Sequence, residues 1–546
     1  MKVLLIQPPV RDFYQTRIRT QPIGLAYLAA SLRLQGFETT ILDCQTGRQR
    51  SIPLPAQFAH LHEIYPSDDR SPFRLYSNFY YFGMGWEEIR REIDACEPDA
   101  VGISSLFTPY HGEALEVARI VKQGGPSRIV IMGGPHVSGD PQGVLNSPLV
   151  DYAVVGEGEV RFPRLLKAIR EKSRISDMEG IGYRNGGKIR INPVAEFIDP
   201  IDTLPWPARD LLDPDRYRIG KRRSAMLITS RGCPHQCAYC SARLVMGNRF
   251  RPRSPEGVVE EMRDCHSRYN ITAFDIEDDN FTFDLARAKH LMNLIIETFG
   301  ERTLCLSAMN GVSFAALDPE LLGLMRRAGF GSVNLSFVST DALTRKTLKR
   351  PGAGPAYFDE VVESAAQEGL SVTAYAIFGL PGQTLPEMVD TLVYLMARRV
   401  LIGPSIYYPS PGTALMERCR EEGVLPPDMS QWRSSAFPVE TKDFDRLDLV
   451  TLFRFTRLIN FLKGKMRNGE MAEGSSWADL YLWSRRGGQE DPPSFPRLLR
   501  LLFDERSFFG LSTGPDGLLF VKKIPSSQRV IDLFLDRALD QIILRA

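Results

Sequence analysis

The residues of this chain best suited to chemistry are three closely spaced cysteines, Cys233, Cys237 and Cys240. An apolar run at residues 225–229 precedes them and predicts a buried strand. Three thiols on one short loop suit a metal centre better than a disulfide framework. A 4Fe–4S cluster is normally held by four thiolates. Three ligands would therefore leave one iron open to bind and activate a small molecule.

Zinc is the alternative occupant of the same loop. Structural zinc takes four nitrogen or sulfur ligands, usually as two separated pairs. The sequence has no second CxxC or HxxxH pair. His235 lies inside the loop and could supply a fourth ligand, but its spacing is not that of a zinc finger. The pattern favours an iron–sulfur cluster.

Composition bounds the class of protein. The chain has 546 residues, enough for two or three domains. Its 67 Lys and Arg residues balance 66 Asp and Glu residues, which gives no indication of a nucleic-acid surface. No apolar stretch approaches the ~20 residues that cross a bilayer, and the first residues do not resemble a signal peptide. Eight cysteines, three of them clustered, fit a reducing compartment, so we expect a cytoplasmic protein.

Strand and helix patterns alternate through the first part of the chain. Apolar strands separated by helical runs imply parallel βαβ units and a doubly wound, Rossmann-like sheet of the α/β class. The segment between Gln45 and Gly85 lacks clear periodicity, so we expect a long functional loop over the sheet edge. The expected strands are residues 3–6, 39–42, 100–104, 129–132 and 152–155, with helices over 24–34, 112–122 and 162–169.

A second alternating pattern follows a proline-rich stretch. Four prolines between about Glu196 and Tyr217 predict an interdomain linker. Six strand–helix units beyond it indicate a partial (β/α)6 barrel, in which chemistry sits at the C-terminal ends of the strands. The expected regions are 1–195, the linker 196–217, the barrel 218–430 and a mainly helical region 431–546, with barrel strands near 225–229, 271–277, 303–308, 332–336, 371–377 and 401–407.

The cysteine spacing CxxxCxxC, with the aromatic Tyr239 before its last cysteine, resembles the radical S-adenosylmethionine (SAM) superfamily. The resemblance covers roughly residues 226–412. It implies that the amino and carboxylate groups of SAM chelate the open iron. One electron from the cluster then cleaves SAM and gives a 5′-deoxyadenosyl radical.

The same resemblance implies several SAM contacts, and Tyr239 belongs among them. The acidic end of the second barrel strand would hold the SAM amino group, since a cationic amine is favoured beside carboxylates. A GLPGxT segment after the fifth strand would pass close to adenine. The fourth strand lacks the usual Glu-Ser-Gly, and a serine there would take over the ribose contact. The residues concerned are Asp278, Asp279, Asn280, Gly379 and Ser336. Asn310 is either a ligand contact or a turn residue.

The N-terminal sheet resembles the cobalamin-binding domain that precedes many radical SAM barrels. Ligands of open α/β sheets lie beyond the carboxyl ends of the strands, where small residues let the backbone approach a large ligand. The resemblance implies that Ser104 and Ser105 contact the corrin or the nucleotide loop. Gly133 and Gly134 would flank the nucleotide tail. The rest of the pocket would be formed by Gly156, Glu157 and Gly158.

One departure from that family concerns the lower ligand of cobalt. Domains that ligate cobalt through histidine carry a D-x-H-x-x-G motif after the first strand, whereas residues 7–13 contain no histidine. The expected binding mode is base-off without a histidine ligand. His136 follows the glycine pair and is expected to contact the tail or to pack. The alternative to cobalamin binding is that this domain binds another ligand, or no ligand.

Three functions fit these parts. The first is a cobalamin-dependent radical SAM methyltransferase acting on an unactivated carbon, or on phosphorus, of a small molecule. The second is a cobalamin-dependent radical SAM cyclase or oxidative enzyme without methyl transfer. The third, of another class, is a catalytically inactive cobalamin-binding sensor, against which the intact cysteine triplet argues. Both enzyme classes need a small-molecule substrate and a reductant such as flavodoxin or ferredoxin.

Overall fold

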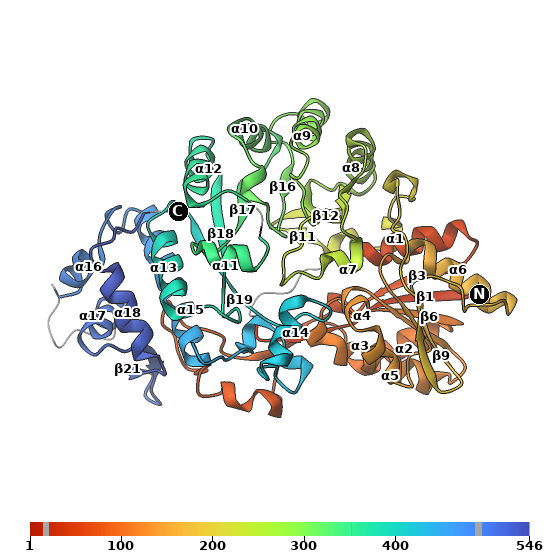
Figure 1. Cartoon of the computed structure of the whole chain (residues 1–546), viewed down its shortest axis with the longest axis horizontal. Coiled ribbons are helices and arrows are strands. Elements are labelled where there is room, and N and C mark those ends of the chain that lie inside the picture. The colour runs from red at the N-terminus through yellow and green to blue at the C-terminus, as the bar shows by residue number, and fades with distance from the viewer. Residues whose placement is uncertain (15–20, 351, 486–493, 545) are drawn as a thin grey trace.

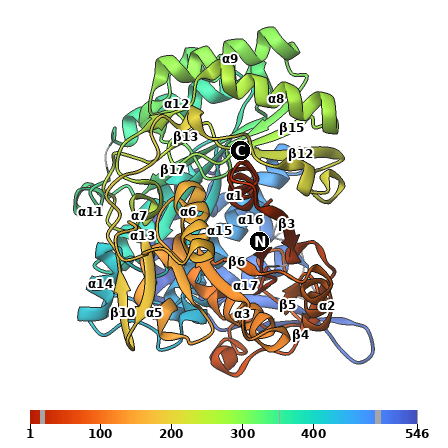
Figure 2. The same ribbon diagram turned by 90° about the vertical axis from the view of Figure 1, so that its right-hand side faces the viewer.

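The structure, a computed structural model, describes residues 1–14, 21–350, 352–485, 494–544 and 546. An N-terminal α/β domain lies beside an open barrel, and a C-terminal helical region lies at the opposite end of the barrel (Figure 1). In the view turned by 90°, helices α8 and α9 are on the outside of the barrel and the N-terminal domain lies below them (Figure 2).

The N-terminal sheet has seven strands in the order β10-β9-β8-β7-β6-β1-β3. The five strands from β3 to β8 are parallel, as predicted, and β1 pairs with both β3 and β6. An antiparallel hairpin that we did not predict extends the other edge. The strands are β1 (Lys2–Gln7), β3 (Glu38–Asp43), β6 (Ala100–Ser104), β7 (Ile129–Gly133), β8 (Tyr152–Val154), β9 (Ile181–Asn185) and β10 (Lys188–Ile191).

Helices cover both faces of this sheet, which makes it doubly wound. One face packs against α1 and α6 around Leu25 and Phe162. The other packs against α2 and α3 around Ile89 and Val117. The helices are α1 (Ile23–Leu34), α2 (Trp86–Cys96), α3 (His111–Gly124), α4 (Pro135–Gly139), α5 (Pro141–Asn146) and α6 (Gly158–Glu171).

The segment between Gln45 and Gly85 is more ordered and more extended than expected. It begins beside β3, where β4 (Gln49–Ile52) and β5 (Phe79–Phe82) form a small antiparallel sheet with β2 (Val10–Asp12). Its middle part reaches the C-terminal helices, because Arg454 donates a hydrogen bond to the carbonyl of Ile64 at 3.0 Å. Its aromatic side chains belong to the same hydrophobic core as the barrel. The insert therefore joins the two ends of the chain.

The barrel contains the six parallel strands that the pattern predicts. They form two three-stranded groups, joined by parallel bridges from Leu306 to Phe330 and from Val312 to Leu335. The strands are β12 (Arg222–Leu227), β15 (Ala273–Ile276), β16 (Cys305–Ser307), β17 (Ser332–Val338), β18 (Ser371–Phe378) and β19 (Leu401–Ile406). The helices are α7 (Ala242–Met246), α8 (Pro255–Tyr269), α9 (Leu285–Phe299), α10 (Pro319–Ala328), α11 (Ala342–Thr347), α12 (Pro355–Gln367), α13 (Leu385–Met396) and α14 (Ala414–Glu421).

Short strands flank the first barrel strand. β11 (Arg218–Ile219) pairs with β12, and β13 (Ser230–Arg231) pairs with β14 (Arg251–Pro252) on either side of the cysteine loop. The preceding linker is held to the barrel by the buried Arg209, which forms a 2.7 Å ion pair with Glu261. The cysteine loop is thus enclosed between a two-stranded ribbon and the end of β12.

The C-terminal region is mainly helical, as predicted, with one added hairpin. A capping box between Asp445 and Asp448 begins the long helix α15. This helix buries Leu449, Phe455 and Leu462 in the core that it shares with the barrel. The elements are α15 (Arg446–Arg467), α16 (Trp477–Ser484), α17 (Phe495–Asp504), α18 (Gln528–Ala538), β20 (Phe509–Thr513) and β21 (Leu519–Lys523).

Lys463 of α15 makes stability depend on pH. Its fully buried ammonium group donates to the carbonyls of Leu395 and Arg398 at the end of α13. Burial and the charge of Arg398 lower the pKa of Lys463 to about 7. An unfolded lysine has a pKa of about 10.4. Between these values the unfolded chain binds one proton more, so the free energy of unfolding rises with pH from about 7 to about 10.

We expect Lys463→Met to remove this rise, which approaches about 1.4 kcal/mol per pH unit. Urea unfolding of the full chain at several pH values in that window measures the slope. Lys465→Met, at a half-buried position of the same helix that pairs with Glu470, is the control and should keep the slope. An equal slope in wild type and Lys463→Met would show that Lys463 is not the group responsible.

Candidate functional site

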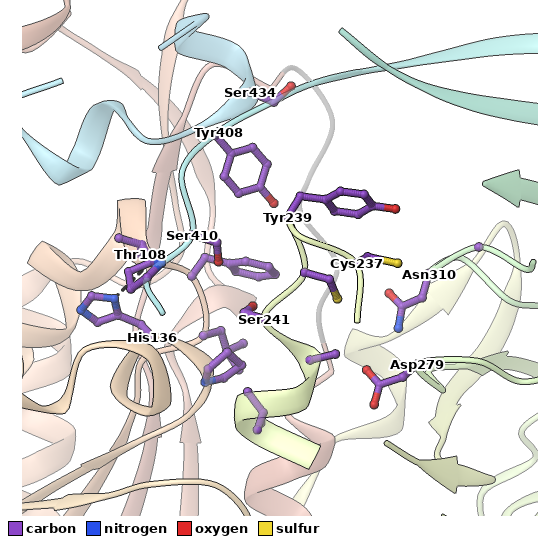
Figure 3. A pocket seen from close by; sticks show the side chains of 18 of the residues that line it. Thr108, His136, Cys237, Tyr239, Ser241, Asp279, Asn310, Tyr408, Ser410 and Ser434 are labelled. Carbon is purple, nitrogen blue, oxygen red and sulfur yellow. Dashed lines mark hydrogen bonds between the residues drawn. The ribbon is translucent and has the colours of Figure 1, made fainter. Parts of the chain in front are cut away.

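A cavity of about 860 Å³ lies between the barrel and the N-terminal domain. We call it the central cavity. All three cysteines of the loop line it, together with Tyr239 and Asp279. Figure 3 shows Cys237, Tyr239, Asp279 and Asn310 on the barrel side, with Thr108 and His136 on the other side. The sequence predicted that the cysteines lie at the C-terminal end of the first barrel strand, and they do.

Backbone contacts hold the cysteine loop in shape. Gly232 has a φ of +77°, and a Cβ atom there would lie 2.3 Å from the carbonyl oxygen of Arg249. Only glycine fits such a position without strain. The amide of Gly232 donates to the carboxylate of Asp279 at 3.0 Å, and the amide of Ala238 donates to the carbonyl of Leu348 at 2.9 Å. The loop is therefore positioned by neighbouring barrel elements on both sides.

The thiols of the loop are partly shielded from water. Burial raises the pKa of the Cys233 thiol, and it raises the pKa of Cys240 to about 11. Such thiols stay protonated until a bound metal centre stabilises the thiolates. Within the described ranges, no three His, Cys, Asp or Glu side chains lie close enough to hold a single metal ion. The donor set, three thiols lining one cavity, fits a multinuclear iron–sulfur cluster.

The acidic end of β15 divides into two sets of residues. Asp279 and Asn280 line the central cavity, and the buried Oδ1 of Asn280 has no hydrogen-bond partner among the described residues. These two groups fit an amine-bearing ligand. Asp278, which we expected to contact SAM, instead accepts three hydrogen bonds of 2.6 Å from Thr229 and Ser230. It is buried and lines neither cavity, so it supports the cysteine loop.

Two further carboxyl groups of the same acidic run, one in β15 and one directly after it, were not singled out by the sequence analysis. Asp275 accepts hydrogen bonds from the hydroxyl of Ser307 at 2.7 Å and from the amide of Met309 at 3.1 Å. Glu277 lies beside it, and burial together with the charge of Asp275 raises the pKa of Glu277 to about 7. Alternate residues of a strand share a face, and this period could have separated Asp278 from Glu277, which lines a second cavity at the edge of the N-terminal sheet, and from Asp279, which lines the central one.

Of the other two predicted SAM contacts, one lines the central cavity and one does not. Ser336 lines the central cavity, and its hydroxyl and carbonyl both accept hydrogen bonds from Arg350. Gly379 does not line the cavity. It has a φ of +82°, and a Cβ atom there would lie 2.8 Å from Leu449 of α15. Glycine is required at this position by the turn and by helix packing, and the expected contact with adenine is not supported.

A second cavity, of about 330 Å³, lies at the carboxyl edge of the N-terminal sheet. We call it the sheet-edge pocket. It adjoins the central cavity, because Leu106, Phe107 and Pro135 line both. Seven residues singled out from the sequence were Ser104, Ser105, Gly133, Gly134, Gly156, Glu157 and Gly158, and all of them except Ser105 line it.

Glycines form the cradle of the sheet-edge pocket. Gly134 has a φ of +110°, and a Cβ atom there would lie 2.8 Å from the carbonyl oxygen of Ser105. Gly102 is packed closely from behind, since its added Cβ would lie 2.7 Å from Leu5. Gly133 differs, because its Cβ would have no neighbour closer than 3.6 Å. The pocket is apolar, narrow and bounded by backbone, which suits the tail of a large ligand.

Two predicted contacts of this pocket have other partners. The hydroxyl of Ser105 is 3.1 Å from Nδ1 of His111, and Ser105 lines neither the central cavity nor the sheet-edge pocket. The carboxylate of Glu157 is fully buried and forms 3.0 Å ion pairs with Arg231 and Arg251. Arg231 also pairs with Glu159 at 2.6 Å. Glu157 therefore joins the N-terminal domain to the residue that precedes Gly232 and Cys233.

Of the two alternatives expected for His136, contact with the cobalamin tail or packing within the domain, the structure shows packing. Its Nδ1 is 3.1 Å from the hydroxyl of Thr108, and its ring centroid is 4.2 Å from that of His111. Burial lowers the pKa of His136 to about 4, so the imidazole is neutral. His136 lines the central cavity, but its ring lies on the far side from the cysteines (Figure 3).

The sequence also missed residues that close the central cavity from the C-terminal side. Arg433 donates to the carbonyl of Pro109 at 3.0 Å and forms a 3.3 Å ion pair with Asp12. Asp12 also accepts hydrogen bonds from Tyr110 and Ser435. The central cavity is lined by all of these residues, namely Asp12, Pro109, Tyr110, Arg433 and Ser435. No local pattern marks these residues, because they come from three distant parts of the chain.

Comparison with known protein families gives a match in the N-terminal α/β domain and a match in the barrel. The B12 binding domain family matches residues 77–166, and the Radical SAM superfamily matches residues 227–395. The chain therefore belongs to the cobalamin-dependent radical SAM enzymes, a family defined by cobalamin, SAM and a 4Fe–4S cluster. No helix in the part of the chain that the structure describes is long and apolar enough to cross a membrane.

Several relatives are methyltransferases by name. An uncharacterized methyltransferase of Pyrococcus horikoshii is 28% identical over 433 residues, covering 78% of this chain and 84% of the relative. The cytidylyl-2-hydroxyethylphosphonate methyltransferase of Streptomyces wedmorensis is 26% identical, covering 79% and 84%. The anaerobic magnesium-protoporphyrin IX monomethyl ester cyclase of Synechocystis is 24% identical, covering 64% and 63%.

Solved structures share the fold. The radical SAM methyltransferase TsrM from Kitasatospora setae, with cobalamin and a 4Fe–4S cluster bound, superposes with a TM-score of 0.58 at 20% identity and covers 80% of this chain and 84% of that one. The cobalamin-dependent radical enzyme OxsB, with aqua-cobalamin and SAM bound, gives a TM-score of 0.62 at 15% identity and covers 92% and 71%.

Proposed function

We propose that this chain is a cobalamin-dependent radical SAM methyltransferase that acts on an unactivated carbon, or on phosphorus, of a small molecule. The observation that carries the proposal is that the two cavities adjoin each other. The cysteine loop lines the central cavity, which adjoins the glycine-lined pocket of the B12 domain. When bound, the cluster supplies the electron that cleaves SAM, and cobalamin carries the methyl group. Both must act on one substrate, so their sites must share one space.

Each part of the chain then has a role. Cys233, Cys237 and Cys240 would hold the cluster. Asp279 and Asn280 would bind the SAM amino group, because a carboxylate and an unpartnered amide oxygen both accept hydrogen bonds from an ammonium. The sheet-edge pocket would hold the nucleotide tail of cobalamin. The substrate would occupy the remainder of the central cavity, which the side chains of Tyr14 and Tyr408 also line.

The cobalamin should be bound base-off and without a histidine ligand. A tail inserted in the sheet-edge pocket cannot also reach the metal, and His136 is held by Thr108 and His111. We expect a base-off absorption spectrum for the protein-bound cofactor. The Co(II) form should give an electron paramagnetic resonance signal without nitrogen hyperfine splitting from a lower ligand. Observation of that splitting would contradict this binding mode.

Filling the sheet-edge pocket should prevent cobalamin binding. Gly133 is the position to change, since a Cβ atom there fits without strain while a longer side chain enters the pocket. We expect Gly133→Leu to lower cobalamin loading at least tenfold, measured by absorbance after desalting. Gly133→Ala is the control and should load nearly normally. Equal loading of both variants would place the tail elsewhere.

The enzyme needs an electron donor, and a flavodoxin or ferredoxin in a reducing cytoplasm suits an oxygen-sensitive cluster. The eight free cysteines agree with such a compartment. The relative that is a cyclase keeps a second function open, namely radical chemistry without methyl transfer. A catalytically inactive sensor is disfavoured, because the three thiols line a cavity that is also lined by Asp279 and Asn280.

Isotope labelling separates these functions. Extracts of cells that lack the gene supply candidate substrates for the reconstituted enzyme, with SAM carrying a deuterated methyl group. A methyltransferase should form S-adenosylhomocysteine and 5′-deoxyadenosine in equal amounts and place the label in the product. Formation of 5′-deoxyadenosine and a new product without label would instead establish the cyclase-like function.

A further inference from the structure

A group of unpaired cations lies on α11 and the turn that follows it. Arg345, Lys346, Lys349 and Arg350 fall within six positions of a chain whose net charge is +1. Among the described residues, none of the four forms an ion pair. Arg345 donates to the carbonyls of Ser339 and Thr340, and Arg350 donates to Ser336. We call these four residues the cation segment. Such a local excess of charge produces a positive potential on the surface around it.

Nearby carboxylates are engaged elsewhere. Asp341 caps the opposite end of α11 and accepts a hydrogen bond from the amide of Thr344 at 2.6 Å. Glu387 accepts hydrogen bonds from the hydroxyl of Ser339 at 2.9 Å and from the amide of Gln383 at 3.2 Å. The charge of the cation segment is therefore not balanced by a bonded partner on the elements that pack against it.

The cation segment is attached directly to the cysteine loop. Leu348, in its middle, accepts the hydrogen bond from the amide of Ala238, which lies between Cys237 and Cys240. Leu348 is buried against Ala238 and Tyr239. On one side Arg350 lines the central cavity, whereas on the other Lys346 and Lys349 are exposed. This segment forms the wall between the cysteine loop and solvent.

An exposed apolar side chain accompanies the lysines. Leu343 of α11 is 71% exposed. An apolar centre with a charged rim is the usual anatomy of a protein interface. Because electron transfer requires a short path, a protein that docks on this wall would be well placed to reduce a cluster held by the loop.

We propose that α11 and the cation segment form the docking surface for an acidic, low-potential electron-transfer protein of the flavodoxin or ferredoxin class. The inference rests on the proposed cluster at the cysteine loop. In the step, the reduced carrier is oxidised by one electron and the cluster is reduced by one electron, with no atom transferred. Complementary charge would steer the encounter and raise its rate.

The test compares two donors on the reconstituted holoenzyme, without SAM and without substrate. Bleaching of the cluster is followed by stopped flow with flavodoxin hydroquinone and with the methyl viologen radical cation. We expect Lys346→Glu/Lys349→Glu to slow reduction by flavodoxin at least tenfold at low ionic strength and not to slow reduction by methyl viologen. Salt should slow the wild type toward the rate of the variant, since it screens exposed charges.

A matched charge reversal provides the control. Lys167 of α6 and Lys188 of β10 are exposed residues of the N-terminal domain, and helix α6 and α11 lie well apart in Figure 1. Lys167→Glu/Lys188→Glu makes the same change of net charge and should reduce at the wild-type rate with both donors.

Three results would overturn the proposal. Equal rates for wild type and Lys346→Glu/Lys349→Glu with flavodoxin would place the donor elsewhere. Slowing by both donors would show that the lysines act on the cluster itself, or on an anionic small molecule, and not on docking. A wild type that accepts electrons from neither donor would overturn the cluster assignment as well, which distinguishes that failure from a failure of docking alone.

Discussion

Replacing Cys233, Cys237 and Cys240 together by alanine is expected to abolish the iron–sulfur absorbance of the reconstituted protein and all cleavage of SAM. The three thiols come from one loop and line one cavity. In our proposal these three thiols are the cluster's only protein ligands, so no thiol would be left to retain it. Iron and sulfide analysis, absorbance near the charge-transfer bands and 5′-deoxyadenosine formation measure the loss.

The control for this variant is Cys305→Ala. Cys305 is a half-buried cysteine of β16 outside the loop. It should keep the full cluster and normal SAM cleavage, and circular dichroism should show that both proteins are folded. A triple variant that still binds a complete 4Fe–4S cluster would refute the assignment of the loop.

Replacing Glu157 by glutamine should destabilise the protein by about 3–5 kcal/mol, because it leaves buried guanidinium groups without their counter-charge. The side chain of Glu157 is fully buried and bonds to Arg231, Arg251 and the amide of Ile198. Since Arg231 precedes the cysteine loop, the variant should also lower cluster content. Chemical denaturation and iron analysis of the same preparation measure the two effects.

Glu301→Gln is the matched control for this charge. Its carboxylate is 52% exposed and forms a 2.8 Å ion pair with Arg327, which is 49% exposed. Exposed ion pairs contribute about 0–1 kcal/mol, so the control should unfold near the wild type. A Glu157→Gln protein that loses less than about 1 kcal/mol would show that the buried network does not hold the domains together.

The fold could be predicted because its signals are local. Each parallel strand of the two sheets is an apolar run between helical patterns, and each overlaps the expected range, with ends that differ by up to three residues, as in β12. The hairpin of β9 and β10 was missed because its strand Lys188–Ile191 is largely exposed and lacks an apolar run. The insert between Gln45 and Gly85 has no period of its own, since its aromatic side chains pack on α15, far along the chain.

The sequence predicted the site residues whose role depends on residue type, and it missed those whose role depends on the direction in which the side chain points. Cysteines and glycines at strand ends line the cavities as expected. Asp278 and Asp279 are adjacent in sequence, yet they point to opposite sides, and only the structure separates their roles. Gly379 satisfies a turn beside α15, which a motif cannot distinguish from contact with a ligand. Arg433 and Asp12 meet only through tertiary packing.

The most direct measurement of the central claim needs no substrate. The holoenzyme, with cobalamin reduced by a chemical donor, is incubated with SAM carrying a deuterated methyl group, and the protein-bound corrinoid is analysed by mass spectrometry. We predict one equivalent of S-adenosylhomocysteine and transfer of the labelled methyl group to the bound corrinoid, with Gly133→Leu showing neither. A corrinoid that stays unlabelled while the cluster cleaves SAM to 5′-deoxyadenosine would contradict the assignment as a methyltransferase.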